Sequence, residues 1–226
     1  VAYLINHKEF FGLDFVINKN VLIPRPETET LVTSALEHLS TSAHKPVTLI
    51  DVGAGSGCIP ISIIKTLKHK NIKAIAIDIS KKTLNVARRN VEKHGVKIKF
   101  VQGDLLEPFI KTYNLKPITC NLIITANLPY LTKKQFDNSS TIQFEPKTAL
   151  VAKNNGLSLY KKLLKQIKQV TCYRLHVTGL FEIDPAQSRP ITRLIKSKFG
   201  NAFGGNDKVT HHIFLLNNFG IVFGIG

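Results

Sequence analysis

The sequence has 226 residues, 43% of them hydrophobic, which fits one packed α/β domain and argues against two full domains or a disordered chain. Its 31 lysine and arginine residues against 15 acidic residues give a net charge of +16. Such an excess is typical either of a protein that works near RNA or the ribosome or of a basic solvated surface. No apolar run reaches the roughly 18 residues that cross a bilayer. No signal peptide is visible either, so we expect a cytoplasmic protein with no membrane partner.

The three cysteines are Cys58, Cys120 and Cys172, and they form no CxxC pair. Neither a zinc ribbon nor a redox motif is therefore predicted. The histidines have no metal-ligand spacing on a common helix face, and we predict no metal site. Cys58 and Cys120 stand in apolar stretches, and we expect both to be small core residues.

Strands and helices alternate along the chain after a short lead-in. Residues 1–26 are expected to be a lead-in segment with a β-hairpin, left over from an N-terminal region, with strands at 13–17 and 21–23. Residues 27–226 are expected to form one domain. Its helices are predicted at 27–39, 58–68, 81–94, 156–170 and 185–198, and its strands at 47–52, 72–78, 97–101, 120–126, 175–183 and 212–216. Because these strands are apolar throughout, the order predicts a mostly parallel seven-stranded sheet with helices on both faces. No element is assigned to 217–226.

A glycine-rich turn follows the first strand of the domain. Asp51 stands near the strand end, and Gly53, Gly55 and Gly57 form a G-x-G-x-G turn that opens a helix. Glycines let the chain bend sharply and let a ligand lie against bare main chain. By itself the turn is compatible with NAD, a flavin, S-adenosylmethionine or tight packing alone.

Two further carboxylates stand at the ends of the next strands. Asp78 follows the turn at the spacing expected for a group that accepts ribose hydroxyls. Asp104 ends the third strand, where it can reach an adenine amino group. All three points fall at carboxyl ends of strands, so the pattern favours nucleoside binding.

The fourth strand ends at Asn127, Leu128, Pro129 and Tyr130. The nitrogen of an amide or an aromatic amine is a weak nucleophile, because its lone pair is delocalised. The Asn127 side-chain oxygen and the Leu128 carbonyl can accept hydrogen bonds from its N–H groups and fix its direction. Pro129 stiffens the turn, and Tyr130 can lie on the flat face of the target. An ordinary Asn-Pro turn is the alternative, but its place after an apolar strand in a glycine-loop domain favours a functional loop.

From about residue 2 to residue 216 the chain resembles the glutamine methyltransferases that modify peptide-chain release factors. The most specific likeness is at 23–29 (Ile-Pro-Arg-Pro-Glu-Thr-Glu). Further matches are 9–15 (Glu-Phe-Phe-Gly-Leu-Asp-Phe), 51–58 (Asp-Val-Gly-Ala-Gly-Ser-Gly-Cys), 87–90 (Ala-Arg-Arg-Asn), 144–146 (Phe-Glu-Pro) with Ala149 and Leu150, and Gly156 and Leu157 with Tyr160.

The resemblance implies a Rossmann-like class I methyltransferase fold with S-adenosyl-L-methionine as cofactor. It implies that Arg25, Pro26 and Glu27 help to cover that cofactor and that Asn127 contacts it as well as the substrate. It also implies that the substrate is the glutamine of the Gly-Gly-Gln loop in release factors, modified by an enzyme that we expect to be a monomer.

One departure keeps a second substrate class open. The family has proline where this chain has Leu128, and Asn-Leu-Pro-Tyr is similar to the loop of rRNA adenine dimethyltransferases. An rRNA adenine-N6 methyltransferase is therefore one alternative. A basic RNA- or ribosome-binding module without catalysis is another. A ribosomal-protein glutamine is a close variant of the first reading.

Overall fold

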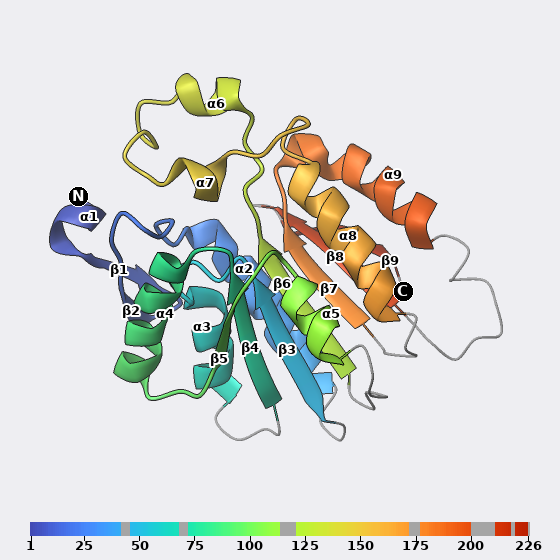
Figure 1. Ribbon diagram of the computed structural model, residues 1–226, viewed down its shortest axis with the longest axis horizontal. Coiled ribbons are helices and arrows are strands. Elements are labelled where there is room, and N and C mark those ends of the chain that lie inside the picture. The colour runs from blue at the N-terminus through green and yellow to red at the C-terminus, as the bar shows by residue number, and fades with distance from the viewer. Residues whose placement is uncertain are drawn as a thin grey trace.

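Seven strands form one sheet through the middle of the computed structural model, which describes residues 1–41, 46–67, 72–113, 121–171, 177–199, 211–217 and 220–225 (Figure 1). The strands are β3 (Val47–Val52), β4 (Ile72–Asp78), β5 (Lys99–Gln102), β6 (Asn121–Asn127), β7 (Val177–Glu182), β8 (His211–Asn217) and β9 (Gly220–Ile225). They lie in the order β5-β4-β3-β6-β7-β8-β9. All run parallel to their neighbours except β9, which is antiparallel to β8. The predicted mostly parallel seven-stranded sheet is confirmed.

Helices cover both faces of this sheet (Figure 1). One face packs against α2 (Glu29–Thr41) and α3 (Cys58–Leu67), with α4 (Lys81–His94) beside them. The other face packs against α5 (Glu107–Tyr113), α8 (Ser158–Thr171) and α9 (Ser188–Phe199). Within β3, Leu49 belongs to the first core and Ile50 to the second, because successive side chains of a strand point to opposite faces. Strands buried on both faces explain why the sequence is apolar throughout these segments.

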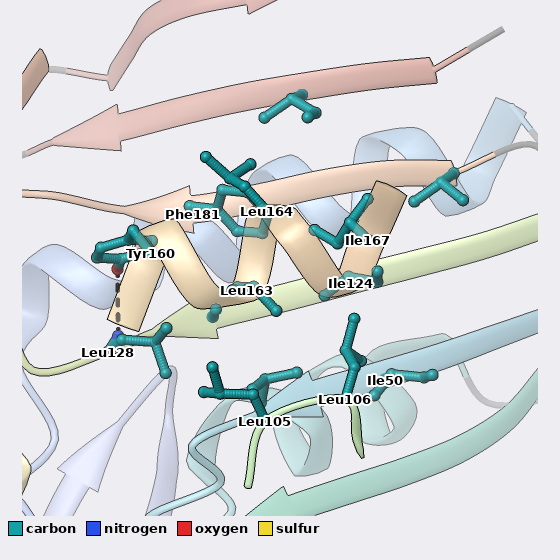
Figure 2. Close-up of a cluster of buried hydrophobic side chains, with 14 of the residues drawn as sticks. Ile50, Leu105, Leu106, Ile124, Leu128, Tyr160, Leu163, Leu164, Ile167 and Phe181 are labelled. Carbon is teal, nitrogen blue, oxygen red and sulfur yellow. Dashed lines mark hydrogen bonds between the residues drawn. The ribbon is translucent and has the colours of Figure 1, made fainter. Parts of the chain in front are cut away.

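The core under α8 lies next to the carboxyl ends of the strands. Figure 2 shows Leu163, Leu164 and Ile167 of α8 lying against Ile124 of β6 and Phe181 of β7. All five are at most 1% exposed. This packing holds α8 against the sheet, and the first turn of the helix places Tyr160 beside the ends of β6 and β7. No helix in the described part of the chain is long and apolar enough to span a membrane.

The lead-in segment forms a hairpin that packs on the domain. After α1 (Ala2–Ile5), the strands β1 (His7–Phe10) and β2 (Leu13–Val16) pair antiparallel around a turn in which Phe11 and Gly12 have positive φ. Asn90 of α4 is fully buried and joins three segments. Its Oδ1 accepts from the Val16 amide at 2.8 Å, and its Nδ2 donates to the carbonyls of Val16 and Ser56, each at 2.9 Å. The hairpin and the glycine turn are thus held by one side chain.

The predicted strand at 21–23 is wrong. The Val21 amide instead donates to the Asn18 carbonyl in a turn, and the Val21 carbonyl accepts from the Tyr3 hydroxyl at 2.7 Å. Pro24 follows at once and lacks the N–H that a strand would need. The partner of β2 is β1, whose polar sequence His-Lys-Glu gave no strand signal.

Several short elements were not predicted. They are α1, α5, α6 (Lys133–Asp137), α7 (Lys147–Leu150) and β9. The helices predicted at 27–39 and 185–198 begin in the structure with the short 3-10 turns η1 (Pro26–Thr28) and η2 (Pro185–Gln187). Cys58 is buried as expected. Cys120 and Cys172 lie outside the described residues, as do the predicted element ends at 68, 120 and 175–176.

Replacing Asn90 by alanine should lower the free energy of unfolding by about 2–4 kcal/mol, because it leaves buried main-chain groups of Val16 and Ser56 without partners. Urea denaturation measures this change. The matched control is Asn85→Ala on the exposed side of the same helix, expected within about 0.5 kcal/mol of wild type. Equal stability of the two variants would contradict the joining role of Asn90.

Candidate active site

A cavity that is open to solvent lies at the carboxyl ends of β3, β4, β5 and β6. Its floor is the main chain of the glycine turn, and its walls are the segments that follow the other strands. The lining residues include 53–56, 77–80, 103–105 and 127–129, with 20–22, 24–25 and 146–149 in part at the mouth. Open α/β sheets bind ligands at this edge. Among the described residues no group of histidines, cysteines and carboxylates has the arrangement of a metal site.

The glycine turn meets the second predicted loop directly. Gly53 and Gly55 have φ of +79° and +54° and line the cavity. A Cβ on Gly53 would lie 3.1 Å from the Leu128 side chain, so a larger residue would push the two loops apart. Gly57 does not line the cavity. A Cβ there would meet Ile61 and Ala87 at 3.1 and 3.3 Å, so this glycine allows close helix packing.

Asp78 and Asp104, predicted to hold a nucleoside, both line the cavity. One oxygen of Asp78 accepts from the Ser80 amide at 2.9 Å and the other from the Gly55 amide at 3.2 Å. Burial raises the pKa of Asp78, and these amides oppose the rise. Asp104 forms an ion pair with Lys162 of α8. Both carboxylates are therefore held in fixed orientations at the cavity wall.

Asp51 lies beneath this wall rather than in it. Its side chain is 1% exposed, and Oδ1 accepts from the Thr125 hydroxyl at 2.7 Å. Oδ2 has no partner among the described residues. Burial raises the pKa of Asp51 to about 7, the Thr125 hydrogen bond opposes the rise, and repulsion from Asp78 adds to it.

The segment before α2 contributes Pro24, Arg25 and Thr28 to the lining of the cavity. Arg25 lines the cavity and forms an ion pair with Glu145, whose side chain is 3% exposed. The second oxygen of Glu145 accepts from the Ile23 amide at 3.2 Å. The motifs at 23–29 and 144–146 are thus joined by one buried carboxylate. Pro26 and Glu27 are exposed and do not line the cavity.

The loop after β6 is held from three sides. Asn127 donates through Nδ2 to the Thr28 hydroxyl at 3.0 Å. The Leu128 amide donates to the Tyr160 hydroxyl at 3.2 Å, the bond drawn dashed in Figure 2. Tyr160 in turn donates to the main-chain carbonyl of Glu182. Asn127, Leu128 and Pro129 line the cavity.

Tyr130 lies just outside that lining and is half-buried. Its carbonyl accepts from Gln187 Nε2 at 2.9 Å. Gly156 makes this approach possible, because a Cβ there would lie 1.9 Å from the Tyr130 oxygen. Burial raises the pKa of the Tyr130 phenol to about 12, so it stays neutral at ordinary pH.

Four residues of this network were not predicted with a role: Thr28, Glu182, Gln187 and Tyr160. Tyr160 was noted only as a sequence match. Glu182, like Asp78, is an acidic residue at the end of an apolar strand, so the pattern that indicated Asp78 could also have indicated Glu182. Gln187 and Thr28 act through contacts 57 and 99 residues away in sequence, which no local pattern reveals.

Fold and cavity together define a Rossmann-like methyltransferase domain, and residues 43–174 match the family described as "Methyltransferase domain". The chain belongs to the family of release factor glutamine methyltransferases. It is 38% identical over 206 residues to the release factor glutamine methyltransferase of Bacillus subtilis, covering 89% of this chain and 68% of that one. The Enterococcus faecalis protein of the same name is 34% identical over 92% of this chain and 73% of its own length. The family assignment made from sequence motifs is confirmed.

A solved structure supports the fold. The N-terminal domain of human METTL16 in complex with SAH has a TM-score of 0.57 at 20% identity, covering 83% of this chain and 67% of that one. At this identity the likeness concerns the fold alone.

The cavity suits S-adenosylmethionine, the methyl donor predicted from the sequence. The main chain at Gly55 lines the cavity, and a Cβ there would have no neighbour closer than 3.9 Å, so the missing side chain leaves space for a closely approaching ligand. Asp78 and Asp104 offer carboxylates on the neighbouring wall for hydroxyl and amino groups, and Ile79 and Leu105 offer apolar surface beside them. A cationic ligand is also favoured next to these acidic side chains.

Asp51→Asn should change how stability depends on pH. The folded pKa of about 7 lies above the ordinary value of 3.8, so the protonated acid is favoured by folding. The stability that the protonated acid contributes is complete below about pH 4 and is lost as the pH rises through 7. Between pH 4.5 and pH 7.5, the free energy of unfolding measured by urea denaturation should fall by roughly 1–3 kcal/mol more for wild type than for the variant. Parallel pH dependence of the two proteins would contradict the buried-acid assignment.

Proposed function

We propose that this chain transfers a methyl group from S-adenosylmethionine to the side-chain amide nitrogen of a glutamine in the Gly-Gly-Gln loop of release factors. The observation that carries the proposal is the orientation of Asn127. Its Nδ2 is committed to Thr28, so its oxygen is the group presented as an acceptor to the cavity. An acceptor selects a substrate nitrogen that carries hydrogen, as a primary amide does.

When bound, S-adenosylmethionine supplies an electrophilic methyl group on a sulfonium and leaves as a neutral thioether. The side chains of this protein do the positioning. Asn127 Oδ1 and the Leu128 carbonyl accept the two amide hydrogens, and Tyr130 packs on the amide plane. Alignment of a weak nucleophile and placed dipoles lower the barrier, and no strong base is needed. The methylated nitrogen then loses its extra proton to water.

Leu128 does not favour an RNA base over an amide. The whole residue is 2% exposed and its side chain packs in the core against the glycine turn, so the side chain offers little surface for selecting a substrate. Its carbonyl, the predicted acceptor, is available from leucine as from proline. Leucine at this place is therefore compatible with a glutamine substrate, and the loop similarity to rRNA adenine dimethyltransferases does not by itself decide between the two substrates.

The charge supports action close to the ribosome or RNA. Helices α8 and α9 contain no acidic residue and carry Lys161, Lys162, Lys165, Lys168, Arg189, Arg193, Lys196 and Lys198. Such a surface attracts a phosphate backbone without sequence preference. A cytoplasmic monomer that meets release factors near ribosomes fits this composition.

The substrate is tested by incubating release factor with this protein and S-adenosylmethionine, followed by peptide mass spectrometry. One added methyl group on the Gly-Gly-Gln glutamine is expected. Asn127→Ala should lower the rate by roughly 100-fold or more and leave donor binding by calorimetry unchanged. The exposed Asn85→Ala is the control and should behave as wild type.

Methylation of rRNA adenine with unmodified glutamine would overturn the proposed substrate. Binding of S-adenosylmethionine without any methyl transfer would favour a module that has lost catalysis. Normal turnover by Asn127→Ala would refute the role of that residue.

Arg25→Ala should weaken binding of S-adenosylmethionine by roughly tenfold. The change leaves buried Glu145 without its cation, so the segment at 23–28 should pack less firmly over the cavity. Isothermal titration calorimetry measures the affinity. Arg193→Ala, at an exposed position of α9, is the control. Wild-type affinity in Arg25→Ala would contradict the covering role.

A further inference from the structure

Glu182 is a buried carboxylate next to the loop that holds the substrate. It ends β7, where it pairs in register with Asn127 at the end of β6, and it is 5% exposed. Burying an ionisable group is costly unless it is paired. No lysine or arginine forms an ion pair with Glu182 within the described ranges. A structural reason for keeping a carboxylate here is therefore missing.

The side chains of Thr28 and Asn127 lie beside Glu182, and both act against the effect of burial on its pKa. The Oε2 atom of Glu182 has no hydrogen-bond partner among the described residues. Thr28 also accepts the Asn127 amide at 3.0 Å. A hydroxyl that accepts from an amide still has its own hydrogen to donate, and a carboxylate can only accept. Thr28 can therefore accept from Asn127 and still donate its own hydrogen, and the Glu182 carboxylate beside them offers only acceptors.

We infer that Glu182 is a positioning residue that fixes the amide of Asn127 with nitrogen inward and oxygen toward the substrate. The inference rests on the proposed function, because it concerns the group that receives the substrate amide. An asparagine amide has nearly the same shape in its two orientations, so only its hydrogen-bond partners decide which atom faces the cavity. Two acceptors behind Asn127 leave its oxygen in front. The reversed amide would present hydrogens to the substrate N–H groups and repel them.

The ionisation of Glu182 governs how firmly this orientation is held. Burial raises the pKa of Glu182 to about 7, and the nearby carboxylate of Glu27 also raises it. Thr28, Asn127 and Arg25 act in the opposite direction. A protonated Glu182 has a hydrogen of its own and accepts less strongly, so the hold on Asn127 weakens. The remaining titratable groups that interact electrostatically with Glu182 are Tyr130, Tyr160 and Cys58. Burial raises the pKa of each, so none of them gains a charge near pH 7.

The test uses Glu182→Gln and Glu182→Leu in the methylation assay, with Asp184→Asn as control. Asp184 is two residues on, and its Oδ1 accepts from the Ala186 amide. We expect kcat to fall roughly tenfold in Glu182→Gln, which keeps an acceptor, and roughly 100-fold in Glu182→Leu. Affinity for S-adenosylhomocysteine, measured by calorimetry, should not change. The control should keep wild-type values.

A pH profile separates positioning from packing. In wild type, kcat/KM should decline as the pH falls below about 7, because protonation weakens the hold on Asn127. The pH profile of Glu182→Gln should lack the part of this decline that protonation of Glu182 causes, and it should therefore be flatter. A merely structural role would lower activity without changing the shape of the profile.

Three outcomes overturn the inference: wild-type kcat in Glu182→Leu, loss of cofactor binding together with kcat, or an unchanged profile in Glu182→Gln. If Glu182→Leu does not fold, the Glu182→Gln profile decides alone. Failure of the proposed function looks different, because wild type itself would then leave the glutamine unmodified.

Discussion

The proposed reaction depends on one constraint: an asparagine at a strand end must present its oxygen to a cavity while its nitrogen is held behind. Thr28, the last residue of η1, accepts from the Asn127 nitrogen, and we propose that Glu182 supports the same orientation from the neighbouring strand. The parallel register of β6 and β7 is what brings the second residue alongside. The two-sided core fixes that register, because slipping one strand by a residue would turn its apolar side chains to the wrong face. Packing and chemistry are therefore linked through the sheet.

The same loop is anchored through its main chain. Tyr160 connects the Leu128 amide to the end of β7, and Gln187 holds the carbonyl of Tyr130. Tyr160 comes from α8 and is completely buried. Such anchoring suits a reaction whose barrier depends on alignment, because a shift of about 1 Å in a reacting group is costly. Opposite this loop, the Arg25–Glu145 ion pair joins two segments 120 residues apart in sequence and completes the cavity wall.

Much of the fold was predictable, because parallel strands buried on both faces carry a clear apolar signal and the helices between them end at recognisable caps. Ser80 accepts from the Thr83 amide and Gly95 closes the same helix, as their types suggest. The hairpin was placed one strand too far along the chain. Its true first strand is polar, and Val21 is held by Tyr3 and a turn, which are contacts that no short pattern records. No alternation of apolar and polar residues is present at 217–226, so no pattern there predicted strand β9.

The site residues that could be predicted are those whose type and position in a local sequence pattern indicate a role. Asp78, Asp104 and Asn127 stand at strand ends, and all three line the cavity. Pro26 and Glu27 were expected beside the cofactor, yet in the structure only Arg25 of that trio lines the cavity. The residues that support Asn127 were harder to find, because their role exists only once the sheet order brings β7 next to β6.

The central claim is that Asn127 offers its oxygen to a glutamine amide. The most direct test is a high-resolution crystal structure of this protein with S-adenosylhomocysteine and a Gly-Gly-Gln peptide. We predict that the glutamine side-chain nitrogen lies within hydrogen-bond distance of both Asn127 Oδ1 and the Leu128 carbonyl, with Asn127 Nδ2 still on Thr28. A glutamine side chain bound elsewhere, or an Asn127 whose nitrogen faces it, would contradict the account.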